Sequence, residues 1–134
     1  MMTTLDVDTA FHAVVAAEAT LEDIPFFLGT SPELLPQTAL GIVATGALNK
    51  VAGDFFLAEV SFLIDSPALE DNLAAHAALC SGLTALLADG AGLISDFQSA
   101  VCSLIGTNLV RTEARTQDER WIFEGVLSIG LVAI

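Results

Sequence analysis

The sequence predicts an α+β fold, in which an antiparallel β-sheet of four to five strands packs against two main helices and ends in a long C-terminal hairpin. Three observations support this prediction. Residues 55–64 alternate with the period of two that a strand requires, residues 69–87 repeat at helical spacing, and the polar parity reverses after residue 119. The element order of helix, strands, helix and strands is typical of the α+β class. At 134 residues, the chain suits a single domain spanning 1–134.

The first predicted element is a short amphipathic helix over residues 5–22. Its apolar side chains recur at helical spacing in an Ala-rich setting, and Asp8 or Thr9 is a candidate N-cap. We therefore expect one face of this helix to pack on the sheet.

The segment 24–38 interrupts the regular structure. It contains three prolines and a glycine and keeps no sustained period, which predicts a loop with buried hydrophobic anchors. Its aromatic pair, Phe26 and Phe27, equally suits a contact with a neighbouring subunit. Both residues are therefore candidates for a subunit interface.

Two strands follow, over residues 40–45 and 55–64, and the Gly- and Asn-containing stretch 46–54 is a plausible hairpin connection between them. The second strand has the clearer pattern, with one face formed by Phe56, Ala58, Val60, Phe62 and Ile64. Its opposite face is also partly apolar. Helices or partner proteins are therefore expected to cover both faces.

The next helix has a predicted start and a predicted stop. Ser66 is a candidate N-cap, Pro67 suits the first helical position, and the helix is expected to end at Asp89 and Gly90. Between these points the spacings of 4, 3, 4, 3 and 4 residues define one helical stripe, formed by Leu69, Leu73, His76, Cys80, Leu83 and Leu87.

The C-terminal third predicts strands. Residues 91–110 fit either a helix or a strand, and we favour a strand for their second half. Odd positions are polar from Arg111 to Glu119 but apolar from Trp121 to Leu131, and one unbroken strand cannot bury both sets on one face. A turn near residues 116–118 resolves the conflict, and it places the arginines on an exposed hairpin arm.

The charge distribution is polarised. Residues 1–110 carry thirteen acidic side chains against one cation, Lys50, whereas Arg111, Arg115 and Arg120 fall within ten positions. A net charge of −13 disfavours a protein that grips nucleic-acid phosphates. We hypothesise that the three arginines form a subunit contact, although ordinary ion pairs within a hydrated hairpin would also explain them. The hydrophobic fraction of 54% favours oligomerisation.

No enzymatic or cofactor signature accompanies this pattern. Among potential soft metal ligands, only His76 and Cys80 have a suitable spacing, and we expect no metal. Neither a catalytic triad nor a Gly-rich phosphate loop is present, so no catalytic residue and no cofactor is predicted. Cys80 and Cys102 lie in apolar contexts that are typical of buried, reduced thiols. The sequence predicts neither a signal peptide nor a membrane span.

The order of elements resembles the tail terminator and tail completion (head-tail joining) proteins of tailed bacteriophages. The resemblance covers most of the chain: the N-terminal helix, the Pro-rich loop, the strand 55–64, the Ser66-Pro67 segment with His76 in the following helix, and the arginine-bearing hairpin that ends in residues 124–129. A related neck or tube component fits the same elements.

This resemblance implies a structural virion protein without enzymatic activity, made in the host cytoplasm. It further implies a ring, commonly a hexamer, at the head-proximal end of the tail. Such a ring contacts the tail-tube and neck proteins, and DNA passes through it without specific binding. The alternative function is a non-viral, homo-oligomeric α+β domain that binds a small ligand in an apolar pocket, and an enzyme is the third candidate.

Overall fold

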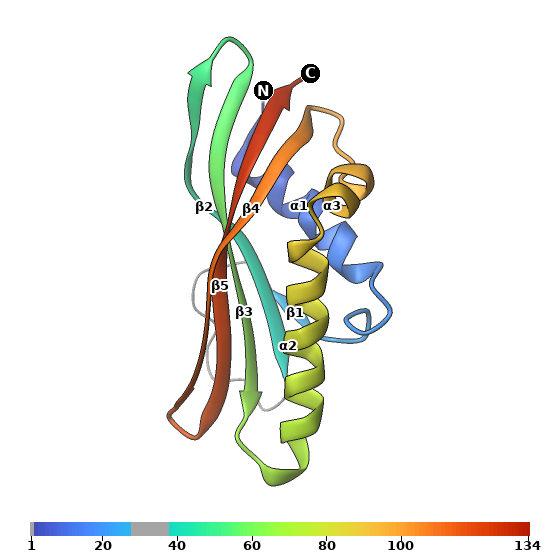
Figure 1. Ribbon diagram of the computed structural model, residues 1–134, viewed down its shortest axis with the longest axis vertical. Helices are drawn as coiled ribbons and strands as arrows, with labels where there is room; N and C mark the ends of the chain where they lie inside the picture. The colour runs from blue at the N-terminus through green and yellow to red at the C-terminus, as the bar shows by residue number, and fades with distance from the viewer. Residues whose placement is uncertain (1, 28–37) are drawn as a thin grey trace.

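The computed structural model describes residues 2–27 and 38–134, which form three helices and five strands (Figure 1). The elements follow the predicted order of helix, strands, helix and strands, with a second short helix before the last two strands. In chain order, with a short 3-10 turn at Glu70–Asn72, the elements are α1 (Thr4–Ala16), β1 (Phe26–Phe27), β2 (Ala39–Ala52), β3 (Phe55–Pro67), α2 (Leu73–Ala88), α3 (Gly90–Asp96), β4 (Cys102–Gln117) and β5 (Arg120–Ala133).

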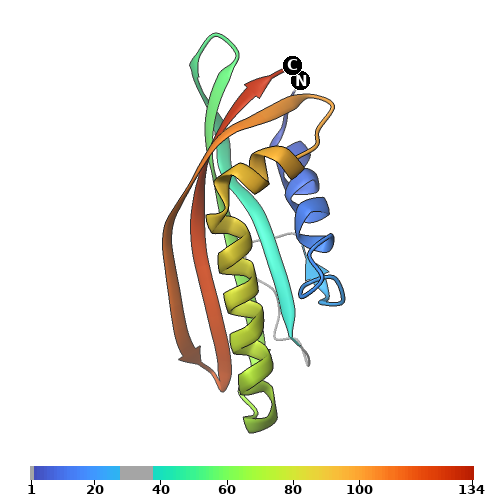
Figure 2. The same ribbon diagram turned by 45° about the vertical axis from the view of Figure 1, so that its right-hand side comes forward.

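The strands form one sheet in the order β1-β2-β3-β5-β4. All neighbouring pairs are antiparallel except β1 and β2, which run parallel. The helices lie on one side of the sheet (Figures 1 and 2), and we call the face that they cover the inner face and the opposite one the outer face. The predicted fold class is therefore confirmed, with one short parallel pair in addition.

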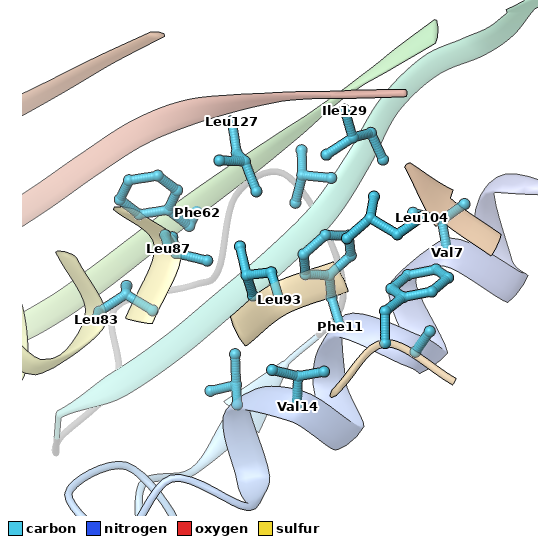
Figure 3. Close-up of a cluster of buried hydrophobic side chains, with 14 of the residues drawn as sticks. Val7, Phe11, Val14, Phe62, Leu83, Leu87, Leu93, Leu104, Leu127 and Ile129 are labelled. Carbon is cyan, nitrogen blue, oxygen red and sulfur yellow. The ribbon is translucent and has the colours of Figure 1, made fainter. Parts of the chain in front are cut away.

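The hydrophobic core fills the space between the inner face and the helices (Figure 3). Phe11 of α1 meets Phe97 edge to face, with ring centroids 5.4 Å apart. Fully burying a large apolar side chain contributes about 1.5–3 kcal/mol, so this layer dominates the stability of the domain. The other large contributors come from every layer of the fold: Phe62, Ile64, Leu83, Leu87, Leu93, Leu127, Ile129 and Leu131.

The N-terminal helix is shorter than predicted and has a different cap. α1 ends at Ala16, and Thr3 caps it in a reciprocal capping box with Asp6. The Asp6 carboxylate accepts a hydrogen bond from the Thr3 backbone N–H at 2.7 Å. The predicted caps were wrong, because Asp8 and Thr9 both lie inside the helix.

The strands before α2 are longer than the sequence pattern indicated. β2 continues to Ala52, so most of the predicted connection 46–54 is strand, and the chain reverses at Gly53, which has a φ of 53°. β3 likewise continues through Ser66 and Pro67, which pair with Trp121 and Arg120. Ser66 therefore does not cap a helix.

The helix α2 begins at Leu73, after the 3-10 turn, so the predicted helix start at Ser66 and Pro67 was wrong. The predicted end at Asp89 is confirmed. A second short helix, α3, begins at Gly90, and the Asp89 side chain caps it by accepting a hydrogen bond from the Gly92 N–H at 3.1 Å. The first part of the ambiguous segment 91–110 is thus helical, and its second half is strand, as favoured.

The hairpin of β4 and β5 confirms that a turn separates the two parities, but Thr116 and Gln117 still belong to β4, so the turn comes later than the predicted 116–118. Its turn consists of Asp118 and Glu119, which have φ values of 53° and 60° and match the type I′ turn of a two-residue hairpin. Along β5 the odd positions from Phe123 to Leu131 are buried, as predicted. Register shifts on β4, between Leu104 and Gly106 and between Leu109 and Arg111, indicate bulges that increase the local twist.

Candidate subunit-contact surface

Two of the three clustered arginines lie on the outer face of the edge strand β4. Arg111 pairs with Val126 and Arg115 with Ile122 in the β4–β5 register. Val126 and Ile122 occupy even positions of β5, which alternate with the odd positions that point into the core. Because directly opposed residues share a face of the sheet, the two arginines lie on the face opposite the helices, with Glu113 between them.

These two arginines differ in their partners. Arg115 forms an ion pair with Glu124 on β5, and its Nε donates a hydrogen bond to Gln117 Oε1 at 3.1 Å. The hydrogen bond to Glu124 raises the pKa of Arg115 above its ordinary value. Arg111 is exposed, and within residues 2–27 and 38–134 no ion pair engages it. Arg111 is therefore available to an acidic partner.

The third arginine is buried. Arg120 is only 7% exposed, and its Nε donates to Asp65 Oδ1 at 2.5 Å. The expectation that all three arginines lie on an exposed arm was therefore wrong for Arg120. Arg120 directly follows the turn and pairs with Gln117, so it stays beside the hairpin tip. It is buried there because β3 extends to Pro67 on its other side and Asp65 of that strand accepts its hydrogen bond. Its Nη2 has no hydrogen-bond partner among the described residues.

The predicted interface residues Phe26 and Phe27 form the short strand β1. Their backbones pair in parallel with Leu40 and Gly41 of β2, so this part of the predicted loop is strand. The side chains of the two phenylalanines lie outside the described part of the structure. Their contact with a neighbouring subunit stays a prediction.

The outer face combines apolar and charged side chains. Leu63, Ile122 and Val126 are half-buried there, and Leu57 is exposed. Glu124 lies among them. None of the helices in residues 2–27 and 38–134 covers this face. Uncovered apolar side chains of this kind are typical of a surface that meets another protein.

A second surface, on α2, was missed by the sequence reasoning. Leu69 and Leu73 were assigned to the buried stripe, but they are 61% and 56% exposed. They lie beside Glu70 and Asp71, which are exposed as well. The predicted stripe is confirmed for His76, Leu83 and Leu87, which are buried together with Leu79.

The sequence does contain a signal for this second surface. No Asp, Glu, Lys or Arg occurs between Leu73 and Ala88, although the chain carries 17 acidic residues. A helix that is apolar all round is normally buried all round, yet α2 exposes the side that faces away from the sheet. The exposed side of α2 consists mostly of alanines.

Ser66, His76 and Cys80 form a row of polar contacts. These residue types also occur in catalytic sites, but their burial here does not suit catalysis. Ser66 Oγ lies 2.8 Å from His76 Nδ1, and His76 Nε2 lies 3.4 Å from Cys80 Sγ. Burial lowers the pKa of His76, partly opposed by the charge of Asp65, and burial raises the pKa of Cys80 to about 11. A thiol with this pKa is a poor nucleophile, and Ser66 is fully buried.

The contacts among Ser66, His76 and Cys80 join β3 to α2. The centroid of the His76 ring also lies 5.8 Å from that of the Trp121 ring on β5. The buried polar groups therefore satisfy one another and fix the position of α2 on the sheet. Cys102 is buried as predicted, whereas Cys80 is only partly buried.

Within the described residues, no group of three or more His, Cys, Asp or Glu side chains is arranged to hold a metal ion. An open hollow of about 460 Å³ lies beside the start of α1, lined by Met2, Thr3, Thr4, Leu48, Phe56 and Ala133. The Thr3 hydroxyl in its wall already interacts with Asp6. The hollow therefore offers few free polar groups to orient a ligand.

Among the described helices, none is by itself both long and apolar enough to cross a bilayer. One bent pair, Glu70–Ala88 with Gly90–Asp96, meets the length and composition test when its two parts are combined across a bend of 79°.

Comparisons with known proteins give a match at the level of the fold. No protein-family model and no curated protein sequence matches the chain. Among solved structures, it is similar to a chain in the virion of a native gene transfer agent particle, with a TM-score of 0.61 and 14% sequence identity. The match covers 96% of this chain and 95% of that chain. The two chains thus share a fold over nearly their whole lengths.

Proposed function

We propose that this protein is a structural component of a phage-type virion. The observation that supports this proposal most is the fold shared with a gene transfer agent virion chain over 96% of this chain. The lengths of the two chains also correspond, since the match covers 95% of the other chain. The site chemistry agrees with a non-enzymatic role, because the Ser66, His76 and Cys80 contacts are internal to the fold.

Within a virion, we propose a ring at the head-proximal end of the tail, as a tail terminator or other neck component. Two observations support self-assembly. The outer sheet face and the exposed side of α2 are separate surfaces on one subunit, and a head-to-tail ring requires two different complementary surfaces. Arg111 and Arg115 contribute to one of these surfaces, and Phe26 and Phe27 stay candidates for a contact. A hexamer is the expected ring.

The same ring would let DNA pass without binding it specifically. The chain has a net charge of −13, and its four cations are few compared with 17 acidic residues. An acidic channel repels phosphates and keeps a passing genome from adhering. The remaining partners in this proposal are the adjacent tail-tube and neck proteins.

Electron microscopy of the purified protein tests the proposal. Negative-stain images and mass photometry should show closed rings whose mass is a small multiple of 13.9 kDa, with six copies as the expected number. Antibody labelling of virions should then locate the protein between head and tail. Compact monomers or dimers that carry a bound small molecule, and no signal in virions, would refute the virion function.

A further inference from the structure

β4 is the outermost strand of the sheet, so one edge of its backbone has no neighbouring strand. An open strand edge presents unpaired N–H and C=O groups to which another strand can bind. The register shifts disturb the first part of this edge, whereas the pairing with β5 is regular over residues 111–117, which we call the open edge segment. Every side chain in it except that of Arg115 is exposed, on both faces of the sheet. The segment therefore has room for a further strand beside it.

The free backbone groups of the open edge segment belong to Thr112, Ala114 and Thr116. Gln117 and Arg120 flank the two-residue turn, and residues in that position form a hydrogen-bonded pair across the hairpin. Bonded residues alternate along an antiparallel strand, so the N–H and C=O groups of the other three residues point away from β5. A neighbouring strand would pair with these groups.

The open edge segment complements itself when two copies run antiparallel about Ala114. Each acidic side chain then lies opposite a basic one of the other copy, and each threonine lies opposite a threonine, and both kinds of pair are favourable between strands. A guanidinium also lies opposite an amide that can accept its hydrogen bond. The opposed pairs are Arg111 with Gln117, Thr112 with Thr116, Glu113 with Arg115, and Ala114 with its counterpart.

Other registers lose this complementarity. Moving the second copy by two residues brings either two Glu113 or two Arg115 side chains face to face, and like charges directly opposite each other are destabilising. Moving it by one residue opposes the free backbone groups of one copy to residues of the other that already bond to β5. The backbone and the side chains therefore select the same register.

The charges within one subunit leave Glu113 without a counter-charge in direct contact. Glu113 lies directly opposite Glu124 of β5, which is a like-charge pair, and Arg115 forms its ion pair with Glu124. Within residues 2–27 and 38–134 no ion pair engages Glu113. The Arg115 guanidinium of a second copy would compensate this charge.

We propose that two copies of this protein join along their β4 edges, antiparallel and in the register centred on Ala114. The free N–H and C=O groups of the two segments bond to each other, and the side chains fix the register. The contact is twofold, so it closes on itself. It goes beyond the proposed function and does not depend on it, because it leaves both faces of the sheet open and would join subunits of two different rings.

Amide hydrogen exchange tests the backbone pairing. In the full-length wild type, exchange at Thr112, Ala114 and Thr116 should slow as the protein concentration rises, because dimerisation covers these N–H groups. Exchange at Glu113 and Arg115 should already be slow in dilute protein, since β5 binds their N–H groups. Exchange at the first three residues that does not change with concentration would refute the contact.

Two charge variants test the register. Glu113→Arg opposes arginines and Arg115→Glu opposes glutamates, so each variant alone should dimerise about tenfold more weakly than the wild type. An equimolar mixture of the two restores opposite charges across the contact and should recover most of the dimer. Glu22→Arg and Lys50→Glu make the same charge changes at exposed positions outside β4, and both should dimerise as the wild type does. Sedimentation velocity measures dimerisation, and circular dichroism verifies folding.

The outcomes separate this inference from the proposed function. Charge variants that dimerise as well as their controls, or a mixture that recovers no dimer, overturn the contact and leave the ring standing. Rings that never join in pairs at any concentration do the same. A wild type that dimerises through β4 but forms no ring and is absent from virions overturns the proposed function and supports the contact.

Discussion

The buried pair of Asp65 and Arg120 should be one of the most sensitive points of the fold. The two side chains keep only 7% and 9% of their surfaces exposed, so water cannot replace either partner. Changing Asp65 to Ala leaves the guanidinium buried without its counter-charge. Removing one partner of a buried ion pair costs about 3–5 kcal/mol, a large share of the roughly 5–15 kcal/mol by which domains are stable.

Urea denaturation followed by circular dichroism measures this loss. With an m-value of about 2 kcal/mol per molar urea, Asp65→Ala should lower the unfolding midpoint by about 2 M. Arg111→Ala is the matched control, because Arg111 is exposed on the neighbouring strand, and it should change stability by no more than about 0.5 kcal/mol. Protein concentration must be equal in all samples, since oligomerisation adds apparent stability.

A double replacement keeps the reasoning testable if Asp65→Ala does not fold. Asp65→Leu together with Arg120→Met removes both charges, and the unpartnered Nη2 of Arg120 with them. Apolar replacement of a buried pair is often neutral or stabilising, so this variant should unfold close to the wild type. An Asp65→Ala cost no larger than that of Arg111→Ala would refute the burial argument, as would a double variant as unstable as Asp65→Ala.

Three further predictions concern the turn, the buried histidine and a crowded glycine. Replacing Asp118 and Glu119 by Asn and Gly should raise stability by about 1–2 kcal/mol in urea denaturation, because both residues adopt positive φ; an unchanged midpoint would contradict this. Because burial lowers the pKa of His76, the unfolded chain binds its proton first, so stability should be complete above about pH 6.5 and fall as the pH drops below it. Melting curves from pH 7.5 to 5.5 test this, and His76→Asn should flatten the dependence. Gly125→Ala should cost about 1–3 kcal/mol in the same denaturation assay, since its Cβ would overlap the Phe62 ring and the Arg111 carbonyl; wild-type stability would refute the crowding.

Sequence periodicity predicted the elements that bury one face. The parity change between Glu119 and Trp121 located the hairpin turn, because a strand has only two faces and burial selects one of them. The alternation of β3 likewise predicted its inner face, since Ala58, Val60 and Phe62 are all buried. These predictions succeeded because they depended on contacts within the domain.

The wrong predictions concern residues whose local sequence fits two different structural roles. Ser66 followed by Pro67 is a frequent helix start, but here the serine hydroxyl interacts with His76, ten residues away, a pairing that local sequence does not encode. The spacing of Leu69 and Leu73 fits a buried stripe, yet only the position of the helix start decides which residues face the core. Arg120 was taken as exposed because its partner, Asp65, is distant in sequence.

The strand order has a consequence for how the protein is made. β5 lies between β3 and β4, although the ribosome synthesises it after both of them. Until residues 120–133 have emerged, β3 and β4 lack their shared neighbour, and the inner face lacks Phe123, Leu127 and Ile129. Nascent or truncated chains without this strand therefore cannot close the sheet and stay exposed to proteases and chaperones. Only chains that have been translated through β5 would be competent to join an assembly.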